Sequence, residues 1–280
     1  MNKLILFLLW IFSICCYAQP TSVIVPYPPG NGGDTIFRIF ETYCQSKNIQ
    51  VVPVYKTGFD GVVGLTTLGN SDSEKYIGIA GTVSIIDTLK QNPNMNFTYI
   101  SLASIPTWSL VASKKSSISS LTELENKIKT TSLNIGSGGA SHVNLIKQLL
   151  DHTKNKSSII VPYKNNNQLI LDLFGGRIDI AFLRSVVALK YEEEGKLTIL
   201  ASTDKINKNI TLLPNRYKNW INVNAYGLVM PENANTEDIK FWSEVMKNFL
   251  NDESTIKLIE NDGSKVPTFG PKYFKKLVEY

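Results

Sequence analysis

A strand-to-helix turn near the start of the chain constrains the fold more than any other feature. Residues 23–38 read VIVPYPPGNGGDTIFR, so a β-branched segment leads into prolines and glycines and then into a helical pattern. The prolines end the strand, and the glycines let a ligand approach the backbone. Asn31 or Asp34 can cap the helix, whose first N–H groups would suit a carboxylate, and Asp34 can pair with Arg38. A turn without any ligand is the alternative.

The first 18 residues are interpreted as a secretory signal peptide. Lys3 precedes an apolar run over residues 4–16, and Ala18 is a small residue just before Gln19. A run of roughly 13 residues is short for a bilayer-spanning helix, which needs about 20. We therefore expect cleavage after Ala18 and a periplasmic mature protein. A retained anchor and a lipid-modified cysteine are the alternatives.

Composition and cysteine content exclude several classes of protein. Cys44 alone remains after the signal peptide, so no intramolecular disulfide can form, and its apolar helical surroundings predict a buried thiol. The formal charge of +5 is scattered, without a basic run interleaved with aromatics, which argues against nucleic acid as a partner. The chain also lacks the spacing of a metal site, a phosphate loop or a catalytic triad. We therefore expect no metal, no cofactor and no enzymatic activity.

Strands and helices alternate along the mature chain, which predicts an α/β fold with parallel-rich sheets flanked by helices. Residues 76–81 are apolar throughout, as a buried parallel strand would be. Residues 236–250 form a long amphipathic helical pattern. If the chain has two lobes, residues 101–107 and 222–227 are the extended segments that can cross between them.

A second glycine-rich turn, residues 136–141, also follows a predicted strand. Ligands of α/β sheets bind at the carboxyl ends of strands, where both glycine turns lie. If the turns belong to different lobes, they face each other across a cleft, and their amides can hold one carboxylate. His142 follows the second turn and is interpreted as a capping or pocket residue in preference to a catalytic base.

Seven motifs, in this order, resemble the Bug family, the receptor proteins of tripartite tricarboxylate transporters. The first turn matches V-P-[FY]-x-P-G-G-G-x-D-x-x-x-R, and residues 58–64 match G-A-x-G-x-x-G. The second turn, extended to His142, matches a glycine loop that ends in Ser-His. The other four motifs are residues 161–164, 173–179, 195–201 and 226–231.

The resemblance implies a two-lobed periplasmic binding protein of the Venus flytrap kind, type II-like, with two hinge strands. Lobe 1 is expected at residues 19–104 and 224–280, and lobe 2 at residues 105–223. Such a receptor captures a small organic acid between its lobes and delivers it, as a monomer, to integral membrane transporter subunits. A sensor that presents the solute to a membrane signalling kinase is the alternative.

Carried over position by position, the resemblance also implies the ligand-binding residues. Those expected are Tyr27, Pro29, Gly30, Asn31 and Gly32 in the first loop, Gly138, Ala140, Ser141 and His142 in the second, and Tyr163 and Asp179 at the rim of lobe 2. Arg184 departs from the family pattern and could pair with a second ligand carboxylate. The alternative for Arg184 is a surface arginine at the start of a helix.

Overall fold

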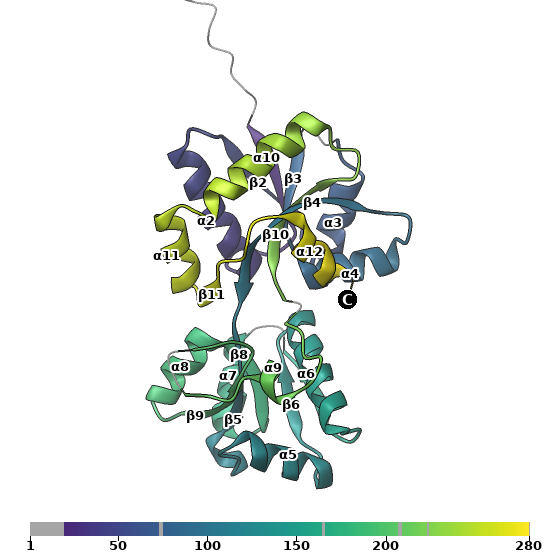
Figure 1. The fold of residues 1–280 in the computed structure, drawn as a ribbon. Coiled ribbons are helices and arrows are strands. Elements are labelled where there is room, and N and C mark those ends of the chain that lie inside the picture. The colour runs from purple at the N-terminus through teal and green to yellow at the C-terminus, as the bar shows by residue number, and fades with distance from the viewer. Residues whose placement is uncertain (1–19, 73–74, 164–165, 207–208, 223, 280) are drawn as a thin grey trace, which may run out of the picture.

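The computed structural model describes residues 20–72, 75–163, 166–206, 209–222 and 224–279. The predicted signal peptide and Lys164 of the fourth motif lie outside these residues. The chain forms two lobes, each built on its own sheet and flanked by helices (Figure 1). Among the residues described, none of the helices combines the length and the apolar composition needed to span a bilayer.

Lobe 1 is built on a six-stranded sheet with the strand order β11-β4-β10-β3-β1-β2. Its strands are β1 (Thr21–Val25), β2 (Val51–Tyr55), β3 (Tyr76–Gly81), β4 (Phe97–Pro106), β10 (Tyr226–Pro231) and β11 (Ser264–Lys265). Its helices are α2 (Gly32–Ser46), η1 (Phe59–Gly61), α3 (Val62–Gly69), α4 (Thr82–Gln91), α10 (Thr236–Phe249), α11 (Glu253–Asn261) and α12 (Pro271–Val278).

Lobe 2 is built on a five-stranded sheet with the strand order β7-β6-β8-β5-β9. Its strands are β5 (Trp108–Ser113), β6 (Asn134–Ser137), β7 (Ile159–Pro162), β8 (Ile180–Arg184) and β9 (Leu197–Ser202). Its helices are η2 (Lys114–Ser116), α5 (Leu121–Thr130), α6 (Ala140–Thr153), α7 (Asn166–Gly175), α8 (Ser185–Glu193) and α9 (Leu213–Arg216).

The α/β alternation and the parallel-rich sheets are as predicted, because most strands in each sheet share one direction, although β10 and β11 in lobe 1 and β5 in lobe 2 run the other way. β1 pairs in parallel with β2 and β3, whereas β10 runs antiparallel to β3 and β4. In lobe 2, β6 is parallel to β7 and β8, whereas β5 is antiparallel to β8 and β9. The reason is that β5 and β10 each enter their sheet from the other lobe. Each of them therefore starts at the edge of the sheet where its neighbouring strands end, and it runs antiparallel to them.

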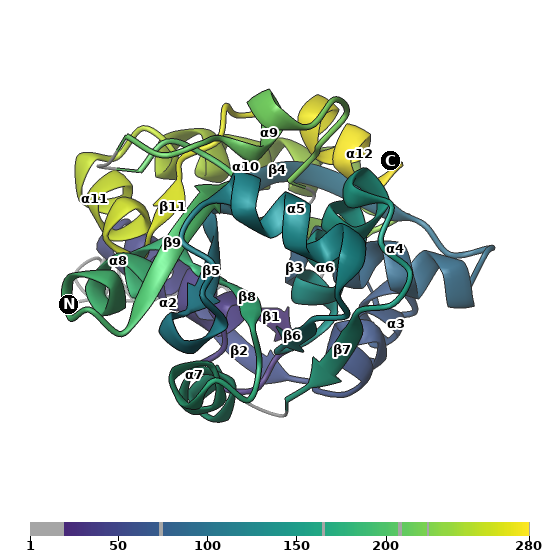
Figure 2. The same cartoon turned by 90° about the horizontal axis from the view of Figure 1, so that it is seen from below.

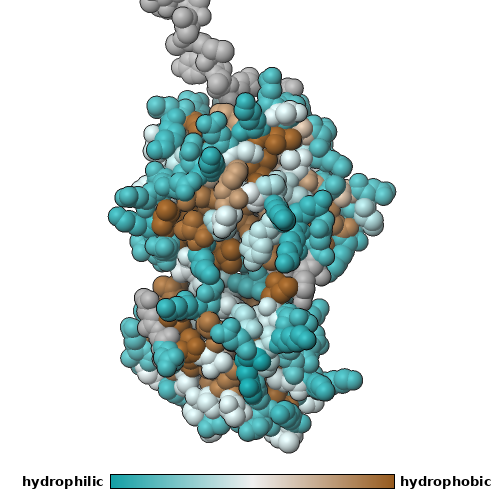
Figure 3. Space-filling view, viewed as in Figure 1, coloured by the Kyte–Doolittle hydropathy of each residue, from teal (hydrophilic) through white to brown (hydrophobic). Residues whose placement is uncertain are grey.

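The chain crosses between the lobes in two segments, as the sequence predicted. β4 continues through Thr107 into β5, and the chain returns to lobe 1 just before β10. In addition, β11 pairs with the end of β4, and both the amide and the hydroxyl of Thr107 donate to the carbonyl of Gly263, at 3.1 and 2.8 Å. Figure 2 looks along the axis that joins the lobes, with lobe 2 in front of lobe 1. The molecular surface narrows where the lobes meet (Figure 3).

The core of lobe 1 packs between the sheet and the helices α2 and α10. The rings of Phe40 and Tyr43 in α2 lie 5.6 and 5.5 Å from that of Phe249 in α10. Cys44 is fully buried beside them, as predicted, and burial raises the pKa of its thiol to about 12. This packing fixes the start of α2, and with it the first glycine turn.

Replacing Phe249 with alanine tests the packing of α10 on α2. Phe249 is 0% exposed, so Phe249→Ala should lower the free energy of unfolding by about 3–5 kcal/mol. Phe241→Ala on the same helix is the matched control. Its ring is 49% exposed, and its loss should change stability by about 0.5 kcal/mol or less. Urea denaturation monitored by circular dichroism measures both changes, and equal losses would contradict this core.

Candidate functional site

A cavity of about 150 Å³ lies between the lobes, where strands of both sheets end. Sites for drug-sized ligands usually measure about 300–1,000 Å³, so this cavity suits a small solute. Lobe 1 and the returning segment line it with Tyr27, Asn31, Gly32, Asp60, Gly81, Thr82, Val83, Ser84, Asn224, Ala225 and Tyr226. Lobe 2 lines it with Trp108, Gly138, Gly139, Ala140, Ser141, His142, Asn166 and Arg184.

The first glycine turn is held by the chain's own side chains. Asn31 caps α2 by accepting a hydrogen bond from the amide of Gly33 at 3.2 Å. The carboxylate of Asp34 accepts from the amide of Gly30 at 2.7 Å and from the hydroxyl of Tyr55 at 2.6 Å. The amides of Gly30 and Gly33 are therefore occupied. We expected this turn to offer several amides to a ligand. The structure leaves only the amide of Gly32 available among the three glycines of the turn.

Gly32 is the residue of this turn that lies closest to the side chain of Tyr226 across the cavity wall. A Cβ atom at this position would lie 2.8 Å from the hydroxyl oxygen of Tyr226, so no larger residue fits without movement. The amide of Gly32 donates to no acceptor within the described part of the chain. It therefore remains open to a molecule in the cavity.

Two amides of the second glycine turn are also bonded within the chain. The amide of Gly138 donates to Nδ1 of His142 at 2.9 Å, and the amide of Ala140 donates to Oδ2 of Asp60, which belongs to lobe 1, at 3.2 Å. His142 is only 4% exposed, and burial lowers the pKa of its imidazole to about 4. At neutral pH the ring is uncharged, which lets Nδ1 accept this hydrogen bond. His142 thus supports the turn, in line with the pocket role predicted for it.

Three buried polar atoms of the cavity wall have no hydrogen-bond partner among the described residues. They are Nε1 of Trp108, Nε of Arg184 and Oδ1 of Asn224. The first two are donors and the third is an acceptor. Buried polar groups normally have partners, and an unmet one costs about 1–3 kcal/mol. Three residues of the cavity wall thus carry two donors and one acceptor that the described part of the chain leaves unmet.

Arg184 lies in the cavity wall and is not the surface arginine of the alternative interpretation. It is the last residue of β8, its side chain is 17% exposed, and its guanidinium carbon lies 5.9 Å from the centre of the Trp108 ring. One of its terminal nitrogens donates to the carboxylate of Asp262 in lobe 1 at 2.6 Å. The guanidinium thus links the lobes and leaves Nε unpartnered.

The structure brings most of the predicted site residues together. Those that line the cavity are Tyr27, Asn31, Gly32, Gly138, Ala140, Ser141, His142 and Arg184. Pro29 and Gly30 belong to the first turn but do not line the cavity. Tyr163 lines a neighbouring groove that shares Asp60 and Gly138 with the cavity, and its hydroxyl donates to Asp172 at 2.9 Å.

The prediction that Asp179 lies at the rim is wrong. Asp179 precedes β8, and its carboxylate accepts from the amide of Asn134 at 2.8 Å, where β6 begins. The cavity lies at the other end of these strands, beyond Ser137 and Arg184. The motif around Asp179 therefore shapes the start of the sheet.

Sequence reasoning missed eleven residues of the wall, among them Asp60, Trp108, Asn224 and Tyr226. Trp108 follows the first predicted crossing segment directly, and Asn224 and Tyr226 lie within the second. Residues where a chain crosses between two lobes must face the space between them. The positions of these residues at the crossing segments could therefore have identified them from the sequence.

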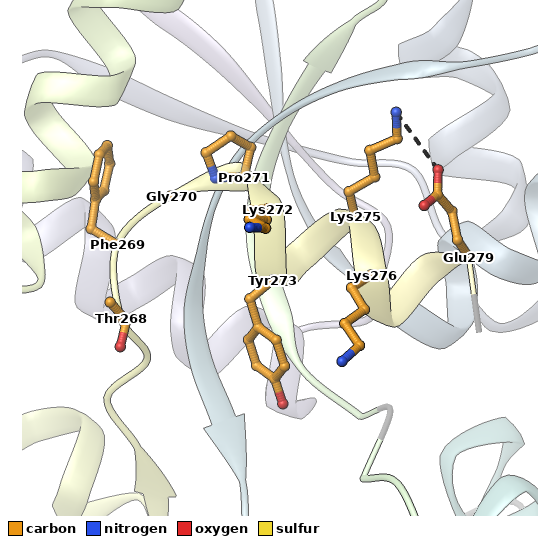
Figure 4. Close-up of a pocket in the computed structure, with 9 residues that line it drawn as sticks. All are labelled: Thr268, Phe269, Gly270, Pro271, Lys272, Tyr273, Lys275, Lys276 and Glu279. Carbon is orange, nitrogen blue, oxygen red and sulfur yellow. Dashed lines mark ion pairs between the residues drawn. The ribbon is translucent and has the colours of Figure 1, made fainter.

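A larger hollow, of about 890 Å³, lies over α12 and the segment before it. Figure 4 shows its lining side chains pointing apart from one another along one stretch of chain. Phe269 and Tyr273 are partly exposed there, and Lys275 pairs with Glu279 at 3.6 Å. Polar groups do not converge in this hollow as they do between the lobes. No group of three or more potential metal ligands occurs in the described ranges.

Comparison with known proteins points to one family. Residues 44–278 match the profile of the tripartite tricarboxylate transporter family receptor. The protein of the TAR-I ttuE-ttuC' intergenic region of Agrobacterium vitis is 25% identical over 174 residues, 59% of this chain and 50% of that protein. The chain thus spans about half the length of this curated relative.

Two solved structures have the same fold. R. palustris Rpa4515 with adipate superimposes with a TM-score of 0.77 at 16% identity, over 94% of this chain and 93% of that one. MatC from Rhodopseudomonas palustris with bound malate superimposes with a TM-score of 0.75 at 17% identity. The superposition covers 94% of this chain and 96% of that one. The two-lobed fold predicted from the sequence is confirmed by this likeness.

The buried imidazole predicts an unusual titration. In a His152→Gln variant, His142 is the only histidine of the chain, and its ring protons should titrate near pH 4 by NMR. The unfolded chain takes up this proton near pH 6.5. The free energy of unfolding should therefore fall by up to roughly 3 kcal/mol as the pH drops from about 6.5 to about 4. A midpoint at pH 6 or above would contradict a buried, neutral His142.

Proposed function

Because the chain belongs to the tripartite tricarboxylate transporter receptor family, we propose that it captures a small organic acid between its lobes and delivers it to the membrane subunits of such a transporter. The family consists of solute-binding receptors and not of enzymes. The segment interpreted as a signal peptide supports a periplasmic location for the mature protein.

The observation that carries the proposal is a pair of unpartnered donors on two residues of the wall. Trp108 Nε1 and Arg184 Nε are buried, unpartnered and close together, because the guanidinium lies over the indole ring. Indole and guanidinium N–H groups donate and cannot accept, so their natural partner is an anionic oxygen. A carboxylate supplies two such oxygens. The proteins solved with adipate and with malate are consistent with this ligand class.

Lobe closure follows from the position of the cavity. Gly32 and Tyr226 belong to lobe 1, Trp108 and Arg184 to lobe 2, and a ligand between them touches both. A ligand stabilises whichever state gives it more contacts, so it favours the closed arrangement. A closed receptor then differs in shape from an open one, which gives a membrane partner a basis for recognising the loaded form.

Ligand binding and one pair of variants test the proposal. A panel of small organic acids should contain members that raise the melting temperature, because a ligand at 100 times its Kd stabilises by about 2.7 kcal/mol. Trp108→Phe removes one donor and should weaken binding of those acids about tenfold or more by calorimetry. Trp220→Phe is the matched control, because its Nε1 is also buried and unpartnered but does not line the cavity.

Two results would contradict the proposal. One is the absence of any thermal shift across mono-, di- and tricarboxylic acids. The other is an equal loss of affinity in Trp108→Phe and Trp220→Phe, which would indicate a general effect of removing a buried indole and not a contact with the ligand.

A further inference from the structure

Asp60 is a negative charge in the cavity wall that is held in place by an unusual backbone. Phe59 and Asp60 both have positive φ, at 46° and 51°, and lie between two glycines with positive φ. Such conformations are uncommon outside glycine, although aspartate and asparagine tolerate them. The turn aims a carboxylate from lobe 1 at the start of α6 in lobe 2.

A chain of hydrogen bonds fixes this turn to the cavity floor. The amide of Gly81 donates to the hydroxyl of Tyr27 at 2.7 Å, Tyr27 lies 2.8 Å from Oγ of Ser84, and Ser84 donates to the carbonyl of Asp60 at 2.6 Å. Because Tyr27 accepts from Gly81 and Ser84 donates to Asp60, the tyrosine hydroxyl donates to Ser84. Asp60 is thus positioned by buried side chains, even though its own carboxylate is exposed.

Two acceptors of the wall lie next to each other at the start of α6. Asp60 Oδ2 accepts from the amide of Ala140 at 3.2 Å. The side-chain nitrogen of Asn224 lies 3.5 Å from the carbonyl of Ser141, the following residue, which leaves Oδ1 of Asn224 without a partner. A carboxylate can accept several hydrogen bonds, so Asp60 retains capacity after its contact with Ala140. This side of the cavity accepts hydrogen bonds, whereas the side formed by Trp108 and Arg184 donates them.

We propose that the solute carries an amino group as well as a carboxylate. This inference rests on the proposed function and assigns its ligand to the small zwitterionic aminocarboxylates. The ligand carboxylate accepts from Trp108 and Arg184, and the ammonium group donates to Asp60 and to Oδ1 of Asn224. Among the described lining residues, Asp60 and Arg184 are the two that carry a full charge, so the wall matches a zwitterion in sign.

A plain dicarboxylate fits this wall less well. Its second carboxylate would meet the like charge of Asp60, which disfavours binding. It also has no proton to donate to Asn224, whose buried oxygen would stay unpaired. Asp60 therefore acts as a specificity-determining residue that selects against a second anionic group.

Matched pairs of ligands test the assignment. Each pair has one chain length, from two to six carbons, and consists of a plain monocarboxylic acid and its amino-substituted counterpart, such as propionate and alanine. Calorimetry should find the amino member of the binding pairs at least about tenfold tighter, as expected for a charge-assisted hydrogen bond. Asp60→Asn keeps the backbone conformation and should remove most of this preference.

Asp87→Asn is the matched control, because Asp87 lines the neighbouring groove with Asp60 but not the cavity. It should leave the preference unchanged. If plain acids bind and their amino counterparts bind no better, the inference is overturned and the proposed function stands. If Asp87→Asn alters the preference as much as Asp60→Asn, the selection comes from general surface charge and the inference also fails. If no member of any pair binds, both proposals are overturned.

Discussion

The ion pair between Arg184 and Asp262 holds the cleft wall in position. Arg184 ends β8 in lobe 2 and Asp262 follows α11 in lobe 1, so this 2.6 Å contact links the two lobes directly. Both side chains are largely removed from solvent, at 17% and 22% exposure, so loss of either partner would leave a poorly solvated charge. The same contact keeps the guanidinium over the ring of Trp108. The donor side of the cavity therefore depends on a residue that does not itself line it.

The two glycine turns have a different role from the one that their sequences suggest. Two amides of each turn bond to side chains of the chain itself, Asp34 and Asn31 in the first turn and His142 and Asp60 in the second. These hydrogen bonds hold each turn in its conformation. Because glycine has no side chain, the backbone of the turns can come close to its neighbours, which brings the two lobes together. Within the cavity wall, side chains supply most of the hydrogen-bonding groups that have no partner in the described part of the chain.

Local features could be read from the sequence, and long-range contacts could not. The cap at Asn31, the pairing of Asp34 with Arg38 at 3.5 Å and the buried Cys44 follow from neighbours within a few turns of one helix. The contact between Asp60 and Ala140 joins residues 80 positions apart. No periodicity encodes such a contact. Asp179 was misplaced for a similar reason, since a motif at the start of a strand gives no indication of which end of the sheet holds the cavity.

The strand order of lobe 1 sets a sequence of assembly. β10 lies between β3 and β4, yet it comes after the whole of lobe 2 along the chain. A growing chain can thus complete lobe 2 from one continuous segment, while the lobe 1 sheet stays split into two halves until its central strand arrives. Lobe 1 must form last, by insertion of a late strand between two early ones, and its contacts are far apart in sequence, which slows folding. Residues 21–106 therefore depend on a strand more than a hundred positions further along the chain to complete their sheet.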